Sequence, residues 1–171
     1  ARVPPGANGV LYTPWIWGER APVDDRNLRA GLYNIALHNT REDVIRAFLE
    51  GIALNTRWLM SPVEKFLGRK VARIHIVGGG AQSDVWCQIF ADALGVEICQ
   101  VSEPVYANAR GAAWFAHAGL GEIRFADVPR LVQFQHQYTP DPRAAAVYTK
   151  KFEVFQQIYR QMKGVYKRLN G

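Results

Sequence analysis

The clearest pattern of apolar and polar positions lies in the middle of the chain. Ile74 and Ile76 alternate with polar residues, and this period of two predicts a β-strand. Three consecutive glycines, Gly78 to Gly80, follow the strand. Beyond them, apolar side chains recur at spacings that predict one buried face of a helix: Val85, Trp86, Ile89, Phe90, Ala93 and Leu94. This stretch therefore predicts a strand, a tight turn and a helix.

The turn between this strand and this helix has features of an anion-binding site. Glycines let the backbone approach a ligand closely, and a helix N-terminus presents unpaired N–H groups and partial positive charge. Ser83 is placed to cap the helix and Gly95 to end it. No lysine follows as in a phosphate-binding loop, and Ser83 occupies the place of the third glycine in a dinucleotide fingerprint. A phosphate site and a tight turn packed on the sheet both fit the pattern.

The remaining elements follow from similar patterns. A capping box at Thr40–Asp43 predicts a helix that runs to about Met60, where Pro62 should bend or end it. Gly51 in the middle of that helix predicts close backbone packing. The other predicted elements are short strands at 10–13 and 32–37, a strand at 96–101, and helices at 106–118 and 143–169.

The two later helices differ in character. Residues 106–118 are rich in Ala and Gly, and such a helix lets another element pack very near its axis. Residues 122–142 contain three prolines and predict irregular chain. The final helix carries a stripe at heptad spacing: Tyr148, Phe152, Phe155, Tyr159, Met162, Tyr166 and Leu169. A helix laid along the domain body is preferred over a coiled coil, and the order of elements predicts an α/β layered domain.

The composition is that of one globular domain. The chain has 171 residues, 49% hydrophobic and 21% charged, which predicts a packed core. Its net charge of +6 favours acidic ligands, but the basic residues are scattered, so nucleic-acid binding is not expected. Cys87, Cys99 and four scattered histidines predict no metal site. Without a membrane-spanning apolar run or a signal peptide, we expect a soluble protein of the reducing cytoplasm.

An aromatic loop at residues 14–22 follows the first predicted strand. It holds Trp15, Trp17 and a Glu19–Arg20 pair between two prolines. Simple packing explains the tryptophans most directly. A loop that lines a ligand cleft is the functional alternative.

Four groups of motifs in this order resemble the C-terminal domain of FGGY-type carbohydrate kinases, closest to the xylulose kinases. They are Pro4–Val10 with Gly18–Pro22, Arg29–Gly31 with Arg46–Ala53, Val77–Ser83 with Trp86, Gln88, Ala91 and Asp92, and Arg110–Ala113. The resemblance covers nearly the whole chain. It implies an actin-like, ribonuclease-H-like fold, with ATP between two lobes and a sugar deep in the cleft.

The resemblance also implies which residues contact the nucleotide. They are Gly31, Gly79, Gly80, Ala81, Ser83 and Asp84. The adjacent glycines and the alanine would lie under the phosphates and ribose, with the serine and aspartate near the adenine. Gly31 would approach the phosphates from the opposite strand turn. Glu19 and Arg20 would order the cleft mouth, while Glu50 and Arg57 are expected to be structural.

The same resemblance places the reaction chemistry outside this chain. Phosphoryl transfer needs a group to accept the hydroxyl proton and carboxylates for Mg²⁺. In the family both come from an N-terminal lobe that opens with an Asp-x-Gly-Thr-type turn, a sequence absent here. Residues 1–171 are therefore expected to be a C-terminal FGGY nucleotide-binding domain without the N-terminal lobe. We expect no catalytic or metal-binding residues of its own, and ATP with Mg²⁺ as cofactors.

The expected activity is transfer of the ATP γ-phosphate to a sugar hydroxyl, with D-xylulose preferred as the pentulose substrate. Kinases of related ketoses, deoxysugars and gluconate have similar C-terminal domains. This chain also has Ala21 where xylulose kinases commonly carry a threonine. The alternative is a non-catalytic module that binds a nucleotide or a partner chain. A dinucleotide-dependent oxidoreductase is disfavoured by Ser83 and by Glu97 at the start of its strand. Exposed cleft aromatics predict some self-association, with a homodimer as one form.

Overall fold

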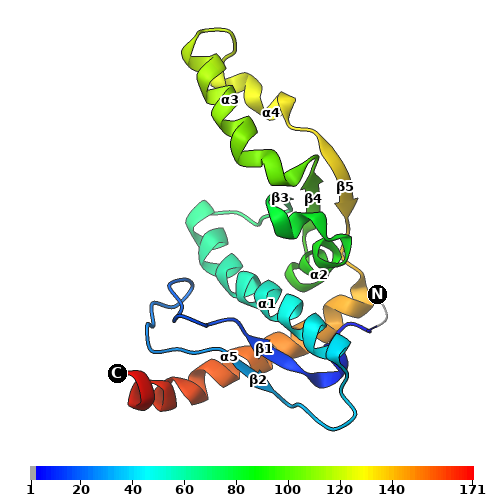
Figure 1. The fold of residues 1–171 in the computed structure, drawn as a ribbon, viewed down its shortest axis with the longest axis vertical. Helices are drawn as coiled ribbons and strands as arrows, with labels where there is room; N and C mark the ends of the chain where they lie inside the picture. The colour runs from blue at the N-terminus through cyan, green and yellow to red at the C-terminus, as the bar shows by residue number, and fades with distance from the viewer. Residues whose placement is uncertain (1–2) are drawn as a thin grey trace.

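Helix α1, Arg41–Leu67, is the helix on which the N-terminal ribbon and two other helices pack (Figure 1). In the computed structural model, which describes residues 3–171, one side of α1 contacts β1, Leu11–Thr13. Strand β1 pairs antiparallel with β2, Gly31–Tyr33. Another side of α1 contacts α2, Asp84–Leu94, which also packs on the C-terminal helix α5, Pro142–Asn170. Helices α1 and α2 therefore lie between the β1–β2 ribbon and a second sheet.

The second sheet has three strands in the order β3-β4-β5. Strand β3, Arg73–Ile76, is parallel to β4, Glu97–Val101, and β4 is antiparallel to β5, Phe134–Tyr138. The shorter elements are η1 (Ala7–Gly9), η2 (Gly79–Gln82), η3 (Pro104–Tyr106), α3 (Ala107–Gly119), η4 (Phe125–Asp127) and α4 (Val128–Leu131). The structure confirms the predicted mixed α/β class.

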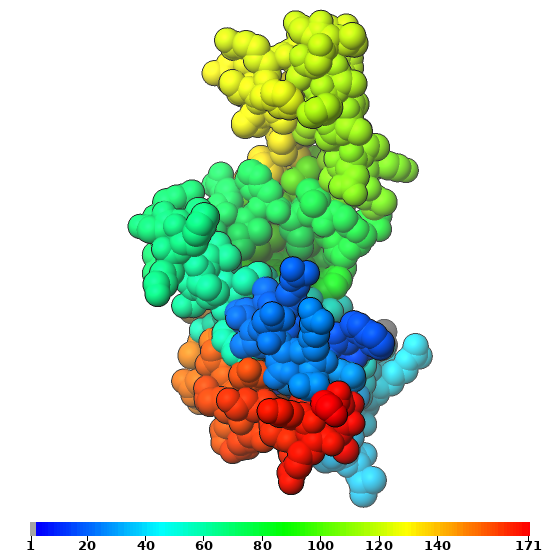
Figure 2. Space-filling model, turned by 90° about the vertical axis from the view of Figure 1, so that its left-hand side faces the viewer, coloured from blue at the N-terminus to red at the C-terminus, as the bar shows by residue number. Residues whose placement is uncertain are grey.

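Helices α3 and α4 project as an arm beyond this sheet (Figures 1 and 2). No residue of α3 is buried, and a Cβ added at Gly111 would meet no atom within 4 Å. The small side chains of α3 permit close approach of another element, but no described segment lies against Gly111.

Strand β5 was not predicted, because residues 122–142 read as irregular chain. Its sequence, Phe-Gln-His-Gln-Tyr, alternates ring side chains with glutamines, but the run is short and four of its five residues are exposed. The strand exists because its backbone pairs with the edge of β4, with a register shift between Gln100 and Val101. That pairing is a tertiary interaction that local periodicity does not report.

The ends of α1 and β2 lie at other residues than the sequence predicts. Helix α1 continues through Pro62 to Leu67, and Gly68 ends it with a left-handed φ of 65°. A proline removes only one hydrogen bond of the helical ladder, which this 27-residue helix tolerates. Strand β2 stops at Tyr33 instead of continuing to residue 37, because Asn34 adopts a φ of 60°. The Asn34 amide donates to the Gly9 carbonyl and fixes that turn.

The main core lies between α1, α2 and α5. Trp15 is fully buried there, with its ring 5.2 Å from that of Phe155. Every member of the predicted α5 stripe except Leu169 belongs to this core or packs against it. Helix α5 therefore lies along the domain body, which is the arrangement that the sequence analysis preferred over a coiled coil. Trp17, in contrast, is 90% exposed, so packing explains Trp15 but not Trp17.

A capping box starts α1, as the sequence predicts. The Thr40 N–H donates to Asp43 Oδ2 at 2.8 Å, and the Asp43 N–H donates to Thr40 Oγ1 at 3.3 Å. Asn8 Nδ2 also donates to Asp43 Oδ1 at 2.9 Å. The backbone hydrogen bond from Thr40 is the main cause that lowers the pKa of Asp43 below its ordinary value.

Stability should therefore depend on the charge of Asp43. Because the folded pKa lies below the unfolded value of about 4, this stabilisation is present at neutral pH and lost as pH falls below about 4. We expect Asp43→Asn to reduce the slope of unfolding free energy against pH in this acidic range. Urea unfolding between pH 3 and 7 measures that slope. An unchanged slope in the variant would contradict the assignment.

Candidate functional site

The glycine turn, Gly78 to Ala81, links β3 to helix α2. Gly78 has a φ of 90° and a ψ of −177°, a conformation that a side chain would strain. Its N–H donates to the Pro104 carbonyl at 2.8 Å, which ties this turn to the one that follows β4. The ends of the two parallel strands are thereby held together.

Gly79 is the open position of the turn. It is exposed, and a Cβ added there would meet no atom within 4 Å. Gly79 and Gly80 begin η2, so their N–H groups have no intrahelical acceptor. A ligand with negatively charged oxygens can therefore approach the backbone at Gly79 without displacing a side chain.

Gly80 is a glycine for a different reason. A Cβ at this position would lie 2.5 Å from Cζ3 of Trp86. The Trp86 indole is itself fixed, since its Nε1 donates to the Leu49 carbonyl of α1 at 3.1 Å. Gly80 is therefore required by packing, whereas Gly79 faces open space.

Ala81 anchors the end of the turn to the core. It is fully buried, and its carbonyl accepts hydrogen bonds from Gln100 Nε2 of β4 and from Cys87 Sγ. Burial raises the pKa of Cys87 to about 11, so its thiol stays protonated near neutral pH. Gln100 is a positioning residue that sequence reasoning missed, because a single glutamine in a strand gives no local signal of its partner.

Ser83 and Asp84 start helix α2. Ser83 Oγ accepts from the Trp86 N–H at 3.3 Å, which confirms the predicted cap. Asp84 is exposed, and its Oδ1 accepts from Tyr138 Oη at 2.8 Å. Burial, with the adjacent Asp84 carboxylate, raises the pKa of Tyr138. The unpredicted strand β5 therefore supplies the hydrogen bond that orients Asp84.

Gly31 does not lie with the other predicted residues. It begins β2, and its N–H donates to Thr13 Oγ1 at 3.0 Å. The β1–β2 ribbon and the α2 end of the glycine turn contact different sides of α1 (Figure 1). A Cβ at Gly31 would meet the Tyr33 ring, which gives this glycine a packing role. Its approach to nucleotide phosphates stays a prediction.

The other charged residues of interest hold loops and helices in place. Glu19 Oε1 accepts from the N–H groups of Arg20 and Ala21, and Glu19 Oε2 accepts from Asn55 Nδ2 at 2.7 Å. The Arg57 guanidinium lies 4.9 Å from the Phe152 ring centroid. These contacts agree with an ordering role for Glu19 and with the structural role expected of Arg57.

Residues 3–171 contain neither a cluster of metal ligands nor a membrane-spanning helix. No group of three or more His, Cys, Asp or Glu side chains is arranged to hold a metal ion. Within the same range, no helix is both long enough and apolar enough to cross a membrane.

Comparison with known families identifies the chain. Residues 1–120 match the C-terminal domain of the FGGY family of carbohydrate kinases. The chain therefore belongs to the FGGY family of carbohydrate kinases, as its motifs suggested.

Relatives named for two different sugars, gluconate and xylulose, are equally similar to this chain in sequence. A gluconokinase from Bacillus licheniformis is 31% identical over 166 residues, which is 96% of this chain and 32% of that protein. A xylulose kinase from Staphylococcus epidermidis strain RP62A is 31% identical over 160 residues, 92% of this chain and 32% of that protein. The chain spans about a third of the length of these relatives.

Solved structures of kinases named for the same two sugars are also similar to this chain. A ligand-bound xylulose kinase from Lactobacillus acidophilus matches with a TM-score of 0.85 at 27% identity, over 98% of this chain and 34% of that one. A gluconate kinase from Lactobacillus acidophilus matches with a TM-score of 0.83 at 27% identity and the same coverage. The fold is the actin-like ATPase fold of these sugar kinases.

Proposed function

We propose that this chain is the nucleotide-binding lobe of an ATP-dependent sugar kinase. The observation that carries the proposal is the glycine turn, whose open backbone at Gly79 leads directly into the capped N-terminus of α2. ATP phosphates and ribose would lie against Gly79, Gly80 and Ala81, and the adenine near Ser83 and Asp84. Membership of the FGGY family supports this placement.

The residues of this lobe bind and orient the nucleotide. Phosphoryl transfer depends mainly on positioning and on charge neutralisation, and ATP supplies the group that is transferred. Trp86, Gln100 and Pro104 hold the glycine turn rigid before the nucleotide arrives. Such rigidity avoids reorganisation on binding.

The described residues do not fit a Mg²⁺ site, because they contain no cluster of three carboxylate or imidazole groups. We therefore derive no step through the metal from this chain. Relatives are about three times as long, so the metal ligands and the general base would lie in parts outside these residues. A cytoplasmic location also stays an expectation.

The proposed substrate is D-xylulose, phosphorylated to xylulose 5-phosphate. The match to a ligand-bound xylulose kinase supports it. D-Gluconate is the second candidate, because a gluconokinase is just as similar in sequence. A non-catalytic nucleotide-binding module is the alternative from another class.

Sugar-dependent ADP release by the full-length protein that carries this chain tests the proposed activity. We expect D-xylulose to give the largest kcat/KM of D-xylulose, D-gluconate and glycerol, measured with a coupled ADP assay. The largest kcat/KM with D-gluconate would overturn the sugar but not the reaction. Nucleotide binding without sugar-dependent ADP release would instead favour the non-catalytic module.

A further inference from the structure

The arginine loop, defined as Trp17 to Arg29, is a rigid loop between β1 and β2. The Gly18 N–H donates to the Leu28 carbonyl at 3.2 Å, and Glu19 and Asp25 exchange two backbone hydrogen bonds of 3.0 and 2.8 Å. A Cβ added at Gly18 would lie 2.8 Å from the Arg26 Cα. These short connections fix the loop without help from a ligand.

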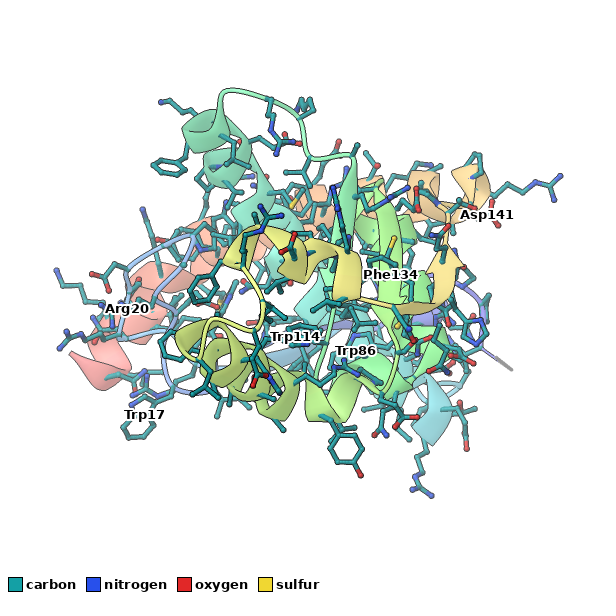
Figure 3. The ribbon with its side chains drawn as sticks, turned by 90° about the horizontal axis from the view of Figure 1, so that it is seen from above. Trp17, Arg20, Trp86, Trp114, Phe134 and Asp141 are labelled. Carbon is teal, nitrogen blue, oxygen red and sulfur yellow. The ribbon has the colours of Figure 1, made fainter. Side chains whose placement is uncertain are left out.

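The loop encloses a hollow of about 600 Å³. Its lining is Trp17, Gly18, Glu19, Arg20, Asp24, Arg26 and Arg29. Figure 3 shows Trp17 and Arg20 at one edge of the molecule, apart from Trp86, which packs on the glycine turn. In Figure 2 the loop region faces the viewer above the C-terminal end of α5. The hollow is therefore separate from the proposed nucleotide site.

The arginines that line this hollow have N–H groups without hydrogen-bond acceptors among the described residues. Both Glu19 oxygens already accept N–H groups, so this carboxylate has little remaining capacity. Within residues 3–171, the guanidinium groups of Arg20 and Arg26 have no hydrogen-bond or salt-bridge partner. Arg29 uses only Nη1, on the carbonyls of Arg26 and Leu28. Guanidinium groups with free N–H donors favour an anion with several oxygens, such as a phosphate.

Trp17 adds a flat apolar surface beside these donors. Its side chain is 90% exposed, which is unusual for the largest aromatic residue. The Arg29 guanidinium lies 5.9 Å from its ring centroid and adds positive charge at its face. An exposed indole of this kind can stack on a ring of a bound ligand.

We propose that the arginine loop binds a phosphate ester, with its phosphoryl group on Arg20 and Arg26 and its organic part over Trp17. Two sources have this chemistry, a nucleotide and a sugar phosphate. The proposal is independent of the proposed kinase function, because the loop shares no residue with the glycine turn.

Calorimetric titration of the chain with ADP and, separately, with xylulose 5-phosphate tests the site. A Gly79→Val background removes the glycine turn as a second site for ADP. We expect saturable binding, weakened about tenfold by Arg20→Ala and by Arg26→Ala, as expected for one lost charge-assisted hydrogen bond. Arg160→Ala, which removes an exposed charge from α5, should leave the affinity unchanged. Both loop arginines are exposed, so these variants should stay folded.

A ¹⁵N spectrum localises the ligand independently. The chain has five tryptophans, and a Trp17→Phe variant assigns the Trp17 indole signal. A shift of the Trp17 signal on titration supports the site. The ester that saturates this shift shows whether the ligand is a nucleotide or a sugar phosphate. Unsaturable binding of both esters, equal weakening in Arg160→Ala, or an unmoved Trp17 signal would overturn the proposal. Loss of binding in the full-length protein would also overturn it, because the loop would then be covered.

Discussion

Replacing Gly51 with alanine is expected to destabilise the chain by about 3 kcal/mol, at the upper end of overpacking effects. Gly51 is buried in the middle of α1, where the helix crosses β1. A Cβ there would lie closer than 3.0 Å to the Tyr12 carbonyl oxygen. That oxygen belongs to backbone that is paired with β2 and cannot turn aside as a side chain could. The sequence-based expectation of close backbone packing at Gly51 is thus confirmed.

Gly164 provides a matched control in helix α5. It is exposed, and a Cβ added there would meet no atom within 4 Å. Gly164→Ala should therefore stabilise the chain by about 1 kcal/mol through helix propensity alone. Urea unfolding of both variants compares the effects. If Gly51→Ala stabilised the chain as Gly164→Ala does, the tight crossing of α1 and β1 would not exist.

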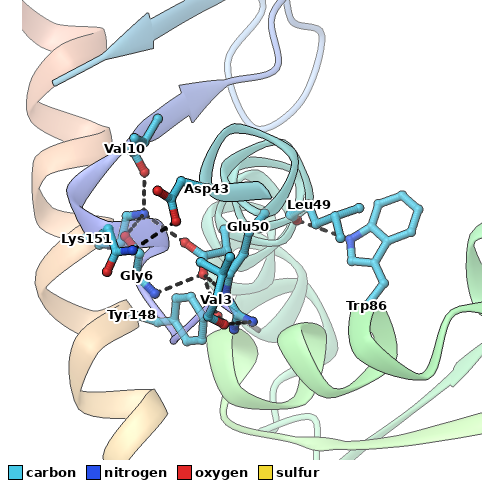
Figure 4. A network of polar contacts seen from close by, with 11 residues as sticks. Val3, Gly6, Val10, Asp43, Leu49, Glu50, Trp86, Tyr148 and Lys151 are labelled. Atoms are coloured by element: carbon cyan, nitrogen blue, oxygen red, sulfur yellow. Dashed lines mark hydrogen bonds and ion pairs between the residues drawn. The ribbon is translucent and has the colours of Figure 1, made fainter. Parts of the chain in front are cut away.

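The second large effect concerns a buried ionic network around Glu50 (Figure 4). Glu50 Oε1 accepts from Arg46 Nε at 2.7 Å, from Tyr148 Oη at 2.9 Å and from the Gly6 N–H at 2.9 Å. Glu50 Oε2 accepts from Lys151 Nζ at 2.8 Å. Glu50 is fully buried, so its charge depends on these partners.

The network also holds a strained turn at the start of the chain. Four consecutive residues, 6 to 9, have φ between 46° and 97°. Such conformations persist only where the surroundings fix them, particularly at the non-glycine residues Ala7 and Asn8. Lys151 Nζ donates to the carbonyl of Gly6, the first residue of this turn, and to that of Val10, which directly follows it.

We expect Lys151→Met to destabilise the chain by about 3 kcal/mol, because it removes the Lys151 donor from Glu50 Oε2 and from the carbonyls of Gly6 and Val10. Of these acceptors, the Gly6 carbonyl keeps a hydrogen bond from the Gly9 N–H. Burial lowers the pKa of Lys151, yet the Glu50 carboxylate favours its charged form. Lys70→Met is the control, since the Lys70 side chain is 89% exposed in its pair with Glu64. That variant should change the unfolding free energy little. Equal effects of the two substitutions in urea unfolding would contradict a stabilising role for the network.

Strong local signals account for the parts of the fold that the sequence predicted well. The alternation at Ile74 and Ile76, the Thr40–Asp43 capping box and the α5 stripe each encode an element through residues close in sequence. Strand β5 was not predicted, because its pairing with β4 is a tertiary property. Helix α3 was predicted, but its exposure was not, because exposure also depends on tertiary neighbours.

The candidate site divides in the same way. The turn and the Ser83 cap were visible in consecutive residues, and the family resemblance was visible in four groups of motifs along the chain. The supports of the turn were not, because Gln100, Pro104 and Tyr138 reach it from later segments. The structure also separates two glycines that sequence treats alike, since Gly80 is fixed by Trp86 and Gly79 is open.

The central claim is that a nucleotide binds on the glycine turn, and calorimetric titration with ADP tests it most directly. Gly79→Val places a side chain in open space, so the variant should fold normally but block the phosphates. Gly164→Val, at another open position, is the matched control. Every protein in this comparison also carries Arg20→Ala and Arg26→Ala, so that ADP binding to the arginine loop does not contribute. We predict saturable ADP binding that Gly79→Val abolishes and Gly164→Val preserves. ADP binding of equal affinity in both variants would contradict the claim.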